Sequence, residues 1–106
     1  MDEVVSDIVN ISEGLPVRID SITAPDFEKK MTAVFEQKEH PKGTTFLLDL
    51  ARVAYISSAG LRVLLMTQKM AHSKGLELII KCSRGAVLEV LHMTGFDKVL
   101  NVEVYE

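Results

Sequence analysis

The sequence predicts an α/β fold in which helices pack against a mixed central β-sheet. Short apolar, β-branched runs alternate along the chain with longer segments whose apolar residues recur at helical spacing. The first two of these runs follow each other closely, which indicates a hairpin and therefore strands of both directions. The chain has 106 residues, 47% hydrophobic and 25% charged, as is typical of one domain with one core. We expect residues 1–106 to form that single domain.

Two β-branched runs come first, at residues 4–11 and 15–19. Glu13 and Gly14 separate them, and glycine is typical of turns. We interpret the two runs as a strand pair joined by this turn.

A helix is predicted from about Pro25, because proline is favoured in a first helical turn. Either Asp20 or Thr23 can cap its start, and residues 40–43 end it. Four apolar residues recur at the spacing of one helical face: Phe27, Met31, Val34 and Phe35.

Residues 45–50 form a nearly continuous apolar run, which favours a central strand covered on both faces. A second helix is predicted over residues 61–72, closed by Lys74 and Gly75. Another buried strand is expected at residues 76–81.

A third helix is predicted from about residue 84 to residue 94, with Gly95 as its stop. Residues 99–105 alternate enough to form a final edge strand, although their first half is also compatible with a short helix.

Composition and charge exclude several classes of function. Twelve Lys and Arg against fifteen Asp and Glu, with a net charge of −3, leave no basic face for a phosphate backbone, so we expect no direct nucleic-acid binding. The N-terminus is acidic and no apolar run approaches the ~18 to 20 residues of a membrane span, which predicts a cytoplasmic protein without membrane contact. The single cysteine, Cys82, is expected to be a core residue in a reducing compartment.

Two hydroxyls, those of Ser57 and Ser58, lie where a loop becomes the second helix. A helix N-terminus has unpaired N–H groups and the positive end of the helix dipole. Ser58 is therefore equally well placed to cap the helix and to carry a phosphate, and placement alone does not choose between these roles. Ala59 and Gly60 add little bulk, which would let another protein approach the serine closely.

Enzymatic and metal-binding interpretations of this segment find no support in the sequence. A hydrolase would need a base beside Ser58, and none of the three histidines has a sequence reason to meet it. Neither the histidines nor Cys82 have the spacing of metal ligands, and the Lys of a phosphate-binding P-loop is missing. A receiver domain phosphorylated on Asp49 would need an acidic pair at the end of a first buried strand, whereas Asp2 and Glu3 precede any predicted strand. The histidines are His40, His72 and His92.

Residues 48–64 resemble the signature of the STAS domain, the family named for sulfate transporters and anti-sigma factor antagonists. In that family an Asp-Leu pair ends a central strand, and a short loop leads to a Ser-x-Gly-Leu turn that opens the next helix. The matching positions are Asp49-Leu50, Tyr55-Ile56, Ser58, Gly60-Leu61 and Val63-Leu64. Further matches at residues 18–20, 24–27, 88–91 and 94–97 extend the resemblance over nearly the whole chain.

The resemblance implies a single STAS domain that acts as a bacterial anti-sigma factor antagonist in stress-response transcription. Such a protein is not an enzyme. Unphosphorylated, it binds an anti-sigma factor that is also a serine kinase with a histidine-kinase-like ATPase fold, and so frees the sigma factor. Carried over by position, Ser58 is the phosphoacceptor whose phosphorylation switches binding off, and a serine phosphatase resets it. The kinase supplies ATP and Mg²⁺, so the resemblance implies no cofactor or metal for this chain.

The resemblance also implies a set of partner-binding residues, from which this chain departs at two positions. Ser57 stands where many members have an acidic residue, which makes it a competing acceptor, and Arg62 stands where many have glycine and could pair with a phosphate or with the partner. Asp49 is expected to orient the turn beneath the serine. The alternative function is a STAS interaction or ligand-sensing module in another signalling or transport complex, not controlled by serine phosphorylation. The implied set is Asp49, Ser57, Ser58, Ala59, Gly60, Leu61 and Arg62.

Overall fold

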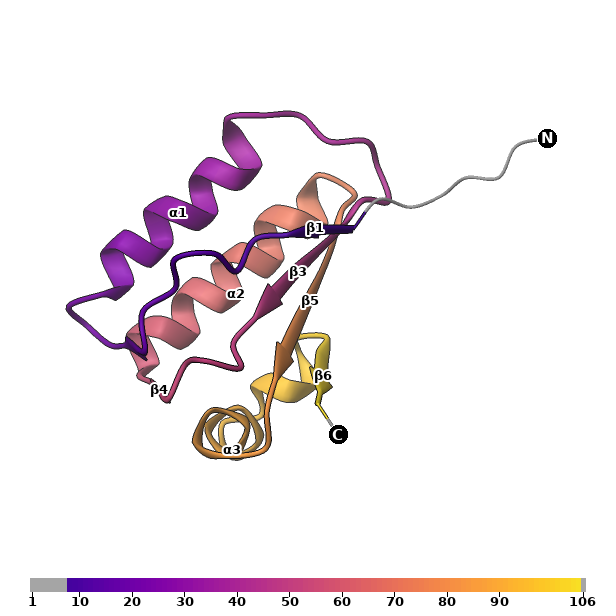
Figure 1. Cartoon of the computed structure of the whole chain (residues 1–106). Coiled ribbons are helices and arrows are strands. Elements are labelled where there is room, and N and C mark those ends of the chain that lie inside the picture. The colour runs from indigo at the N-terminus through magenta and orange to yellow at the C-terminus, as the bar shows by residue number, and fades with distance from the viewer. Residues whose placement is uncertain (1–7, 106) are drawn as a thin grey trace.

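The computed structural model describes residues 8–105, in which two helices lie on one face of a four-stranded sheet (Figure 1). In chain order, the elements are β1 (Ile8–Asn10), β2 (Arg18–Ile19), α1 (Ala24–Glu36), β3 (Thr45–Asp49), β4 (Tyr55–Ile56), α2 (Ser58–Ser73), β5 (Glu77–Cys82), α3 (Ala86–Met93), the 3₁₀ turn η1 (Phe96–Lys98) and β6 (Val102–Val104). The expected α/β class, with helices packed against a central sheet, is confirmed.

The strands form two separate parallel sheets. The larger has the order β1-β3-β5-β6, with Leu48 of β3 opposite Ile80 of β5. The smaller pairs β2 with β4 and places Ile19 opposite Ile56. Parallel strands need a crossover connection, and α1 and α2 provide such connections here.

The predicted hairpin between the first two strands is wrong within the described residues. β1 pairs with β3 and β2 with β4, so each finds its partner on the far side of α1. The backbone groups of the connection explain this, because Ile11 N–H donates to the Leu47 carbonyl and Ala54 N–H donates to the Val17 carbonyl. Every described strand pair is parallel, so the mixed direction expected from the hairpin is not found there. Residues 4–7 of the first expected strand lie outside the described residues.

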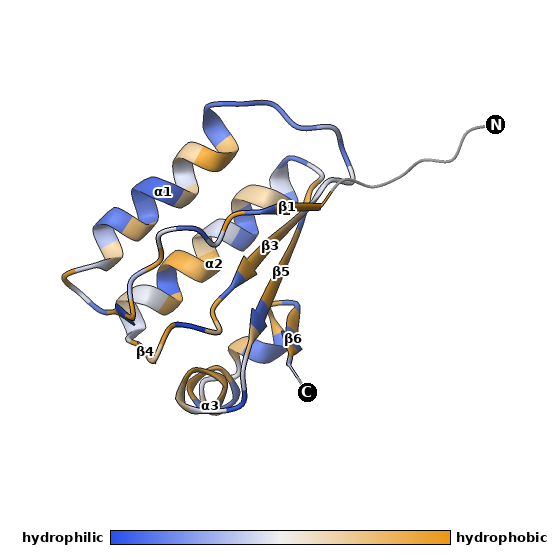
Figure 2. Cartoon of the chain, in the orientation of Figure 1, coloured by the Kyte–Doolittle hydropathy of each residue, from blue (hydrophilic) through white to orange (hydrophobic). Residues whose placement is uncertain are grey.

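The apolar stripe predicted for the first helix faces the core. Phe27, Met31 and Phe35 are buried, and the Phe35 ring lies 4.8 Å from that of Phe46 on β3, centroid to centroid. Figure 2 shows the strands beneath α1 and α2 as largely apolar. Burying each large side chain of this kind stabilises a fold by roughly 1.5–3 kcal/mol, so the stripe fixes α1 against the sheet.

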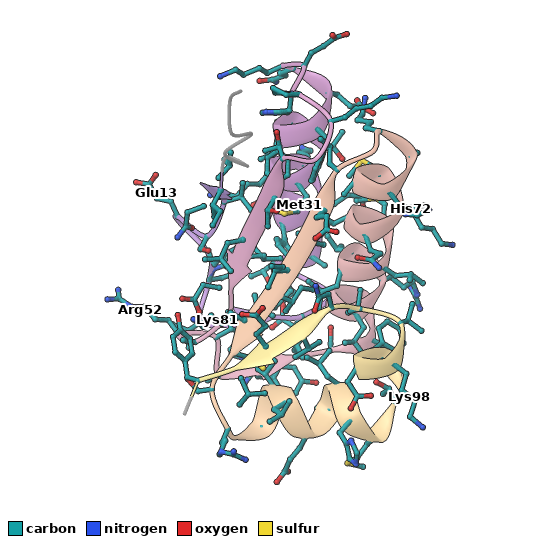
Figure 3. All side chains as sticks on the ribbon, turned by 90° about the vertical axis from the view of Figure 1, so that its right-hand side faces the viewer. Glu13, Met31, Arg52, His72, Lys81 and Lys98 are labelled. Atoms are coloured by element: carbon teal, nitrogen blue, oxygen red, sulfur yellow. The ribbon has the colours of Figure 1, made fainter. Side chains whose placement is uncertain are left out.

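β3 is covered on one face only, contrary to the prediction of a central strand covered on both faces. Phe46 and Leu48 are fully buried, whereas Leu47 and Asp49 are half-exposed on the other face. Leu47 lies directly opposite Ile79 of β5, so apolar residues on the open face shelter each other across strands and make the run look continuous. Figure 3 looks onto this face, on which Lys81 lies.

The later elements lie close to where the sequence predicts them. α3 spans Ala86–Met93, and Gly95, with φ of 78°, adopts the left-handed conformation typical of a helix stop. Of the two structures considered for residues 99–105, the edge strand occurs as β6, whereas the helical turn η1 lies just before this segment, at Phe96–Lys98. The second helix begins three residues earlier than the expected residue 61, at Ser58.

Candidate functional site

The two neighbouring hydroxyls at the start of α2 have different surroundings. Ser57 is the N-cap, with an extended backbone and an Oγ that accepts a hydrogen bond from the Gly60 N–H at 3.4 Å. Its own N–H donates to the Ile19 carbonyl at 2.8 Å, which extends the β2–β4 pairing by one residue. Ser58 is the first residue of the helix and is exposed. The capping position expected for Ser58 therefore belongs to Ser57, because only the residue still in extended conformation can reach the N–H of the third helical residue.

Gly60 serves the packing of α2 onto the small sheet beneath it. A Cβ at this position would lie 2.7 Å from side-chain carbons of both Ile19 and Ile56, which are buried. Gly60 itself is buried, so its small size allows the helix that carries Ser58 to pack closely on the β2–β4 pair. Its role in the approach of a partner stays a prediction.

The implied partner-binding residues of α2 divide into a buried and an accessible group. Leu61 is buried in the core, as is Gly60, and both support the site from inside the domain. Ser58 and Arg62 are exposed, and Ser57 and Ala59 are half-exposed. A partner that approaches the start of α2 would meet these four residues first.

A groove of about 390 Å³ runs between α1 and α2 and is lined by Ala59, the residue that follows Ser58. Ile22, in the turn before α1, is 83% exposed, although it is large and apolar. Sequence analysis missed this groove because it forms only when the two helices pack together. The residues that line the groove include Ser21, Pro25, Glu28, Ala59, Arg62 and Met66.

Hydrogen bonds fix the turn that carries Ile22. The Asp20 carboxylate accepts from the backbone N–H of Thr23 at 3.1 Å and of Ile22 at 3.0 Å. The Thr23 bond above all holds the pKa of Asp20 below its ordinary value, and the Ile22 bond and the nearby Arg18 act in the same direction. Thr23 occupies the N-cap position of α1 without capping it through its side chain, because its hydroxyl oxygen accepts from the Asp20 N–H at 2.9 Å and its proton goes to the Arg18 carbonyl at 2.8 Å.

The exposed side of the small sheet carries a cation–aromatic pair. Arg18 and Tyr55 are opposite each other on β2 and β4, and the guanidinium carbon lies 4.4 Å from the centre of the ring. The same guanidinium lies 3.7 Å from the Asp20 carboxylate. Arg18 is therefore occupied within its own sheet.

Asp49 lies in a second polar cluster, at the end of β3. Its Oδ1 accepts from the Ala51 N–H at 2.9 Å, and its Oδ2 accepts from the Tyr105 hydroxyl. The Lys81 ammonium lies 4.4 Å from the centre of the Tyr105 ring. Asp49 thus orients the loop that leads toward β4, and no described residue between 57 and 62 donates a hydrogen bond to it. Sequence analysis did not single out Tyr105.

Burial and charge shift two pKa values in this cluster. The hydrogen bond to Asp49, helped by desolvation and by the carboxylate's negative charge, raises the pKa of Tyr105. Cys82 is fully buried, as expected of a core cysteine, and burial together with the charge of Asp49 raises the pKa of its thiol.

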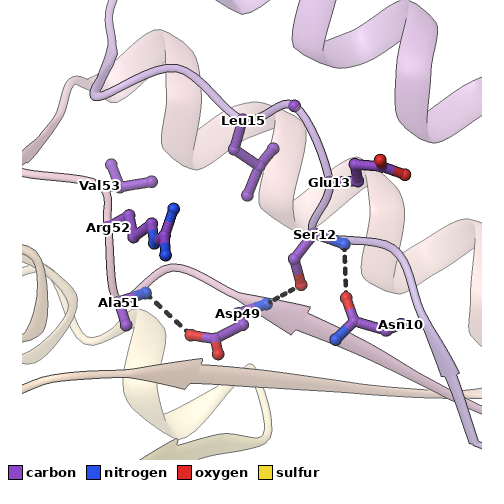
Figure 4. A pocket seen from close by; sticks show the side chains of 9 residues that line it. Asn10, Ser12, Glu13, Leu15, Asp49, Ala51, Arg52 and Val53 are labelled. Carbon is purple, nitrogen blue, oxygen red and sulfur yellow. Dashed lines mark hydrogen bonds between the residues drawn. The ribbon is translucent and has the colours of Figure 1, made fainter.

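A larger groove of about 690 Å³ adjoins Asp49 (Figure 4). The Asp49 N–H donates to the Ser12 hydroxyl at 2.7 Å, and the Ser12 N–H donates to the Asn10 side chain at 2.9 Å. The residues that line it come from the loops after β1 and after β3, and they include none of residues 57–62. The two candidate surfaces are therefore separate.

The described residues place no histidine beside Ser58. His40 bonds through its ring to the Val34 carbonyl, and His92 to the Asp97 carboxylate. His72 is in the last turn of α2, about 21 Å from Ser58 along the helix at 1.5 Å per residue. Within residues 8–105, no three His, Cys, Asp or Glu side chains are grouped as a metal site would require. No helix of this part of the chain has the length and apolarity needed to span a membrane.

Comparison with known proteins identifies the family. The model of the STAS domain matches residues 14–106. A Bordetella bronchiseptica protein provisionally named anti-sigma factor antagonist BtrV is 31% identical over 96 residues, which cover 91% of this chain and 77% of that protein. A Thermotoga maritima crystal structure, also provisionally named an anti-sigma factor antagonist, has a similar fold, with a TM-score of 0.75 and 24% identity over 98% of this chain and 84% of that one. The chain therefore belongs to the STAS domain family.

Proposed function

We propose that this protein is an anti-sigma factor antagonist that binds an anti-sigma factor through the start of α2 and is switched by phosphorylation of Ser58. The observation that carries the proposal is the exposed Ser58 hydroxyl in the first turn of a 16-residue helix whose next turn is fixed in the core. The names of the relatives support the antagonist role. The protein would act in the cytoplasm of a bacterium, without catalysing a reaction itself.

Ser58 is the better acceptor because the Ser57 hydroxyl already has a structural role. A phosphate on Ser57 would disrupt the cap that Ser57 provides to the Gly60 N–H, and Ser57 is half-buried. A phosphate on Ser58 would instead lie in solvent beside a helix N-terminus, where negative charge is favourable. The fold can therefore tolerate phosphorylation of Ser58 with little rearrangement.

Release would follow from charge and desolvation. A phosphoserine adds about −1.5 to −2 charges, which are costly to bury in an interface and repel acidic groups of a partner. The partner would be a serine kinase with a histidine-kinase-like ATPase fold that brings its own ATP and Mg²⁺, and a serine phosphatase would restore binding. The Ser58 hydroxyl is held at a fixed, accessible position, because Gly60 lets α2 pack closely on Ile19 and Ile56.

Paired variants test the switch. Ser58→Ala and Ser58→Asp proteins are used as baits in a lysate of the native bacterium, and the affinity of the captured ATPase is then measured by calorimetry. We expect the alanine bait to retain the ATPase and the aspartate bait to bind it at least tenfold more weakly, about 1.4 kcal/mol. Ser83→Asp, which places the same charge at an exposed position after β5, is the matched control and should bind normally. Equal affinities for all three proteins would overturn the proposal.

A ligand-sensing module is the second candidate, favoured by the groove of about 690 Å³ beside Asp49. In that case Ser58→Asp would leave partner binding unchanged. Arg52→Ala, which alters the wall of the groove, would abolish partner binding. Partner binding that is weakened by Ser58→Asp supports the switch, and partner binding that is unchanged by Ser58→Asp but abolished by Arg52→Ala supports the ligand-sensing module.

A further inference from the structure

We propose that Arg62 is the counter-ion of phosphorylated Ser58, so that phosphorylation also withdraws Arg62 from the groove between α1 and α2. The inference rests on the proposed function in one respect, because it takes Ser58 as the phosphorylated residue. It adds a means by which a phosphate at one residue changes the surface one helical turn away.

Helix geometry brings the two side chains together. Ser58 and Arg62 are four residues apart in α2, which makes them neighbours on one face with Cβ atoms about 5–6 Å apart. Side chains in a helix tend to lean toward its N-terminus, so the Arg62 side chain can reach the turn that carries Ser58. Both are exposed, and an acidic group four residues before a basic one is the more favourable order.

Arg62 is free to take this role. Within residues 8–105 no carboxylate lies within 4.0 Å of its guanidinium, although Glu28 lines the same groove. Arg18, in contrast, is held by Tyr55 and Asp20. A guanidinium matches a phosphate with two parallel hydrogen bonds, which a lysine cannot reproduce.

The unphosphorylated position of Arg62 gives the pairing a consequence for binding. Arg62 lines the groove with Glu28 and Met66, and it also lines a hollow of about 490 Å³ farther along α2 with Lys69 and Met70. A partner on this face would meet a cation flanked by flexible apolar side chains. Phosphorylation would then add negative charge at Ser58 and remove a positive group from the surface at the same time.

The test measures the ionisation of the phosphate by ³¹P NMR. Phosphoserine is built into position 58 during synthesis of the full chain, so no kinase is needed. Because a guanidinium stabilises the dianion, Arg62→Gln should raise the second pKa of the phosphate by about 0.3 pH unit or more toward its ordinary value near 6. The shift should shrink in 1 M salt, where charges are screened within about 3 Å.

Lys69→Gln is the matched control, because it removes one positive charge from the same helix about 16 Å from Ser58 at 1.5 Å per residue. It should leave the phosphate pKa unchanged. Circular dichroism checks that both variants fold. Equal titration curves for the wild type, Arg62→Gln and Lys69→Gln would overturn the inference.

A binding measurement separates this inference from the proposed function. If Arg62 belongs to the surface offered to the partner, unphosphorylated Arg62→Gln should bind the anti-sigma factor several-fold more weakly than the unphosphorylated wild type does. If Arg62→Gln does not shift the phosphate pKa but Ser58→Asp still weakens partner binding, only the role of Arg62 as counter-ion is rejected. A normal NMR shift without any effect of Ser58→Asp on binding would reject the switch and keep the ion pair.

Discussion

The start of α2 and the end of β3 are only a few residues apart in sequence, yet they use polar side chains in opposite ways. At the end of β3, the Asp49 carboxylate is occupied by Ala51 and Tyr105. At the start of α2, the Ser57 hydroxyl caps the helix, while Ser58 remains exposed on a backbone fixed by packing. The comparison shows how a hydroxyl is kept accessible: a neighbouring side chain caps the helix, and the hydroxyl itself stays exposed.

Gly60→Ala is the strongest test of the close packing of α2 on the β2–β4 pair. The added carbon would overlap Ile19 and Ile56 at 2.7 Å, and overpacking of this kind costs about 2 kcal/mol or more. We expect a fall in melting temperature of roughly 10 °C for a domain of this size, measured by calorimetry. Ser58→Ala, two residues away and exposed, is the control and should change stability by less than about 0.5 kcal/mol. A well-folded Gly60→Ala protein with unchanged stability would show that α2 is not held closely on the small sheet.

Ser57→Ala sharpens the distinction between the two serines. Loss of an N-cap costs about 1 kcal/mol, so urea unfolding should show a lower midpoint for Ser57→Ala than for Ser58→Ala. Phosphate mapping by mass spectrometry should still find Ser58 modified in the Ser57→Ala protein. Loss of all phosphorylation in that variant, with the fold intact, would make Ser57 the acceptor.

Tyr105→Phe tests the occupied cluster through its pH dependence. Because the pKa of Tyr105 is raised by folding, its neutral hydroxyl stabilises the protein fully below the unfolded value of about 10. That contribution is lost as the pH rises through the folded pKa. Wild type should therefore be more stable than Tyr105→Phe at pH 8, and the difference should start to fall above pH 10 and disappear above the raised folded pKa. A difference that grows with pH would contradict the hydrogen bond to Asp49.

The smallest effect is expected at Asp20, where the sign is opposite. Folding lowers the pKa of Asp20, so its ionised form stabilises the turn above the unfolded value of about 4, and the contribution is lost as the pH falls through the folded pKa. The stability difference between wild type and Asp20→Ala should thus be present at pH 7 and vanish in acid. A constant difference from pH 7 to pH 2 would mean that the charge of Asp20 is irrelevant to the turn.

Local signals in the sequence were sufficient to predict most helices and strands, but not to predict which strands pair with each other. The stripe of Phe27, Met31 and Phe35 defines α1 because helical spacing is a property of neighbouring residues. Strand pairing is not local, and the preference for a short turn over a crossover led to a hairpin where β1 in fact pairs with β3.

The candidate site shows the same limit. Sequence reasoning located the two serines, but it could not decide which one caps the helix, because that depends on Ser57 continuing the pairing with Ile19. The contact between Asp49 and Tyr105 joins residues 56 positions apart. The tight fit of Gly60 against Ile19 is likewise created by the fold, and no pattern near either residue indicates it.

The parallel pairing of every described strand has a consequence for how fast the chain acquires its structure. No described strand can find its partner in an adjacent hairpin, since each pair is separated by a helix or a long connection. Each pairing must therefore first overcome the entropy of closing a long loop. We expect this domain to refold more slowly than a helical bundle of equal length, with the docking of α1 and α2 and the closing of the sheet as coupled, late events.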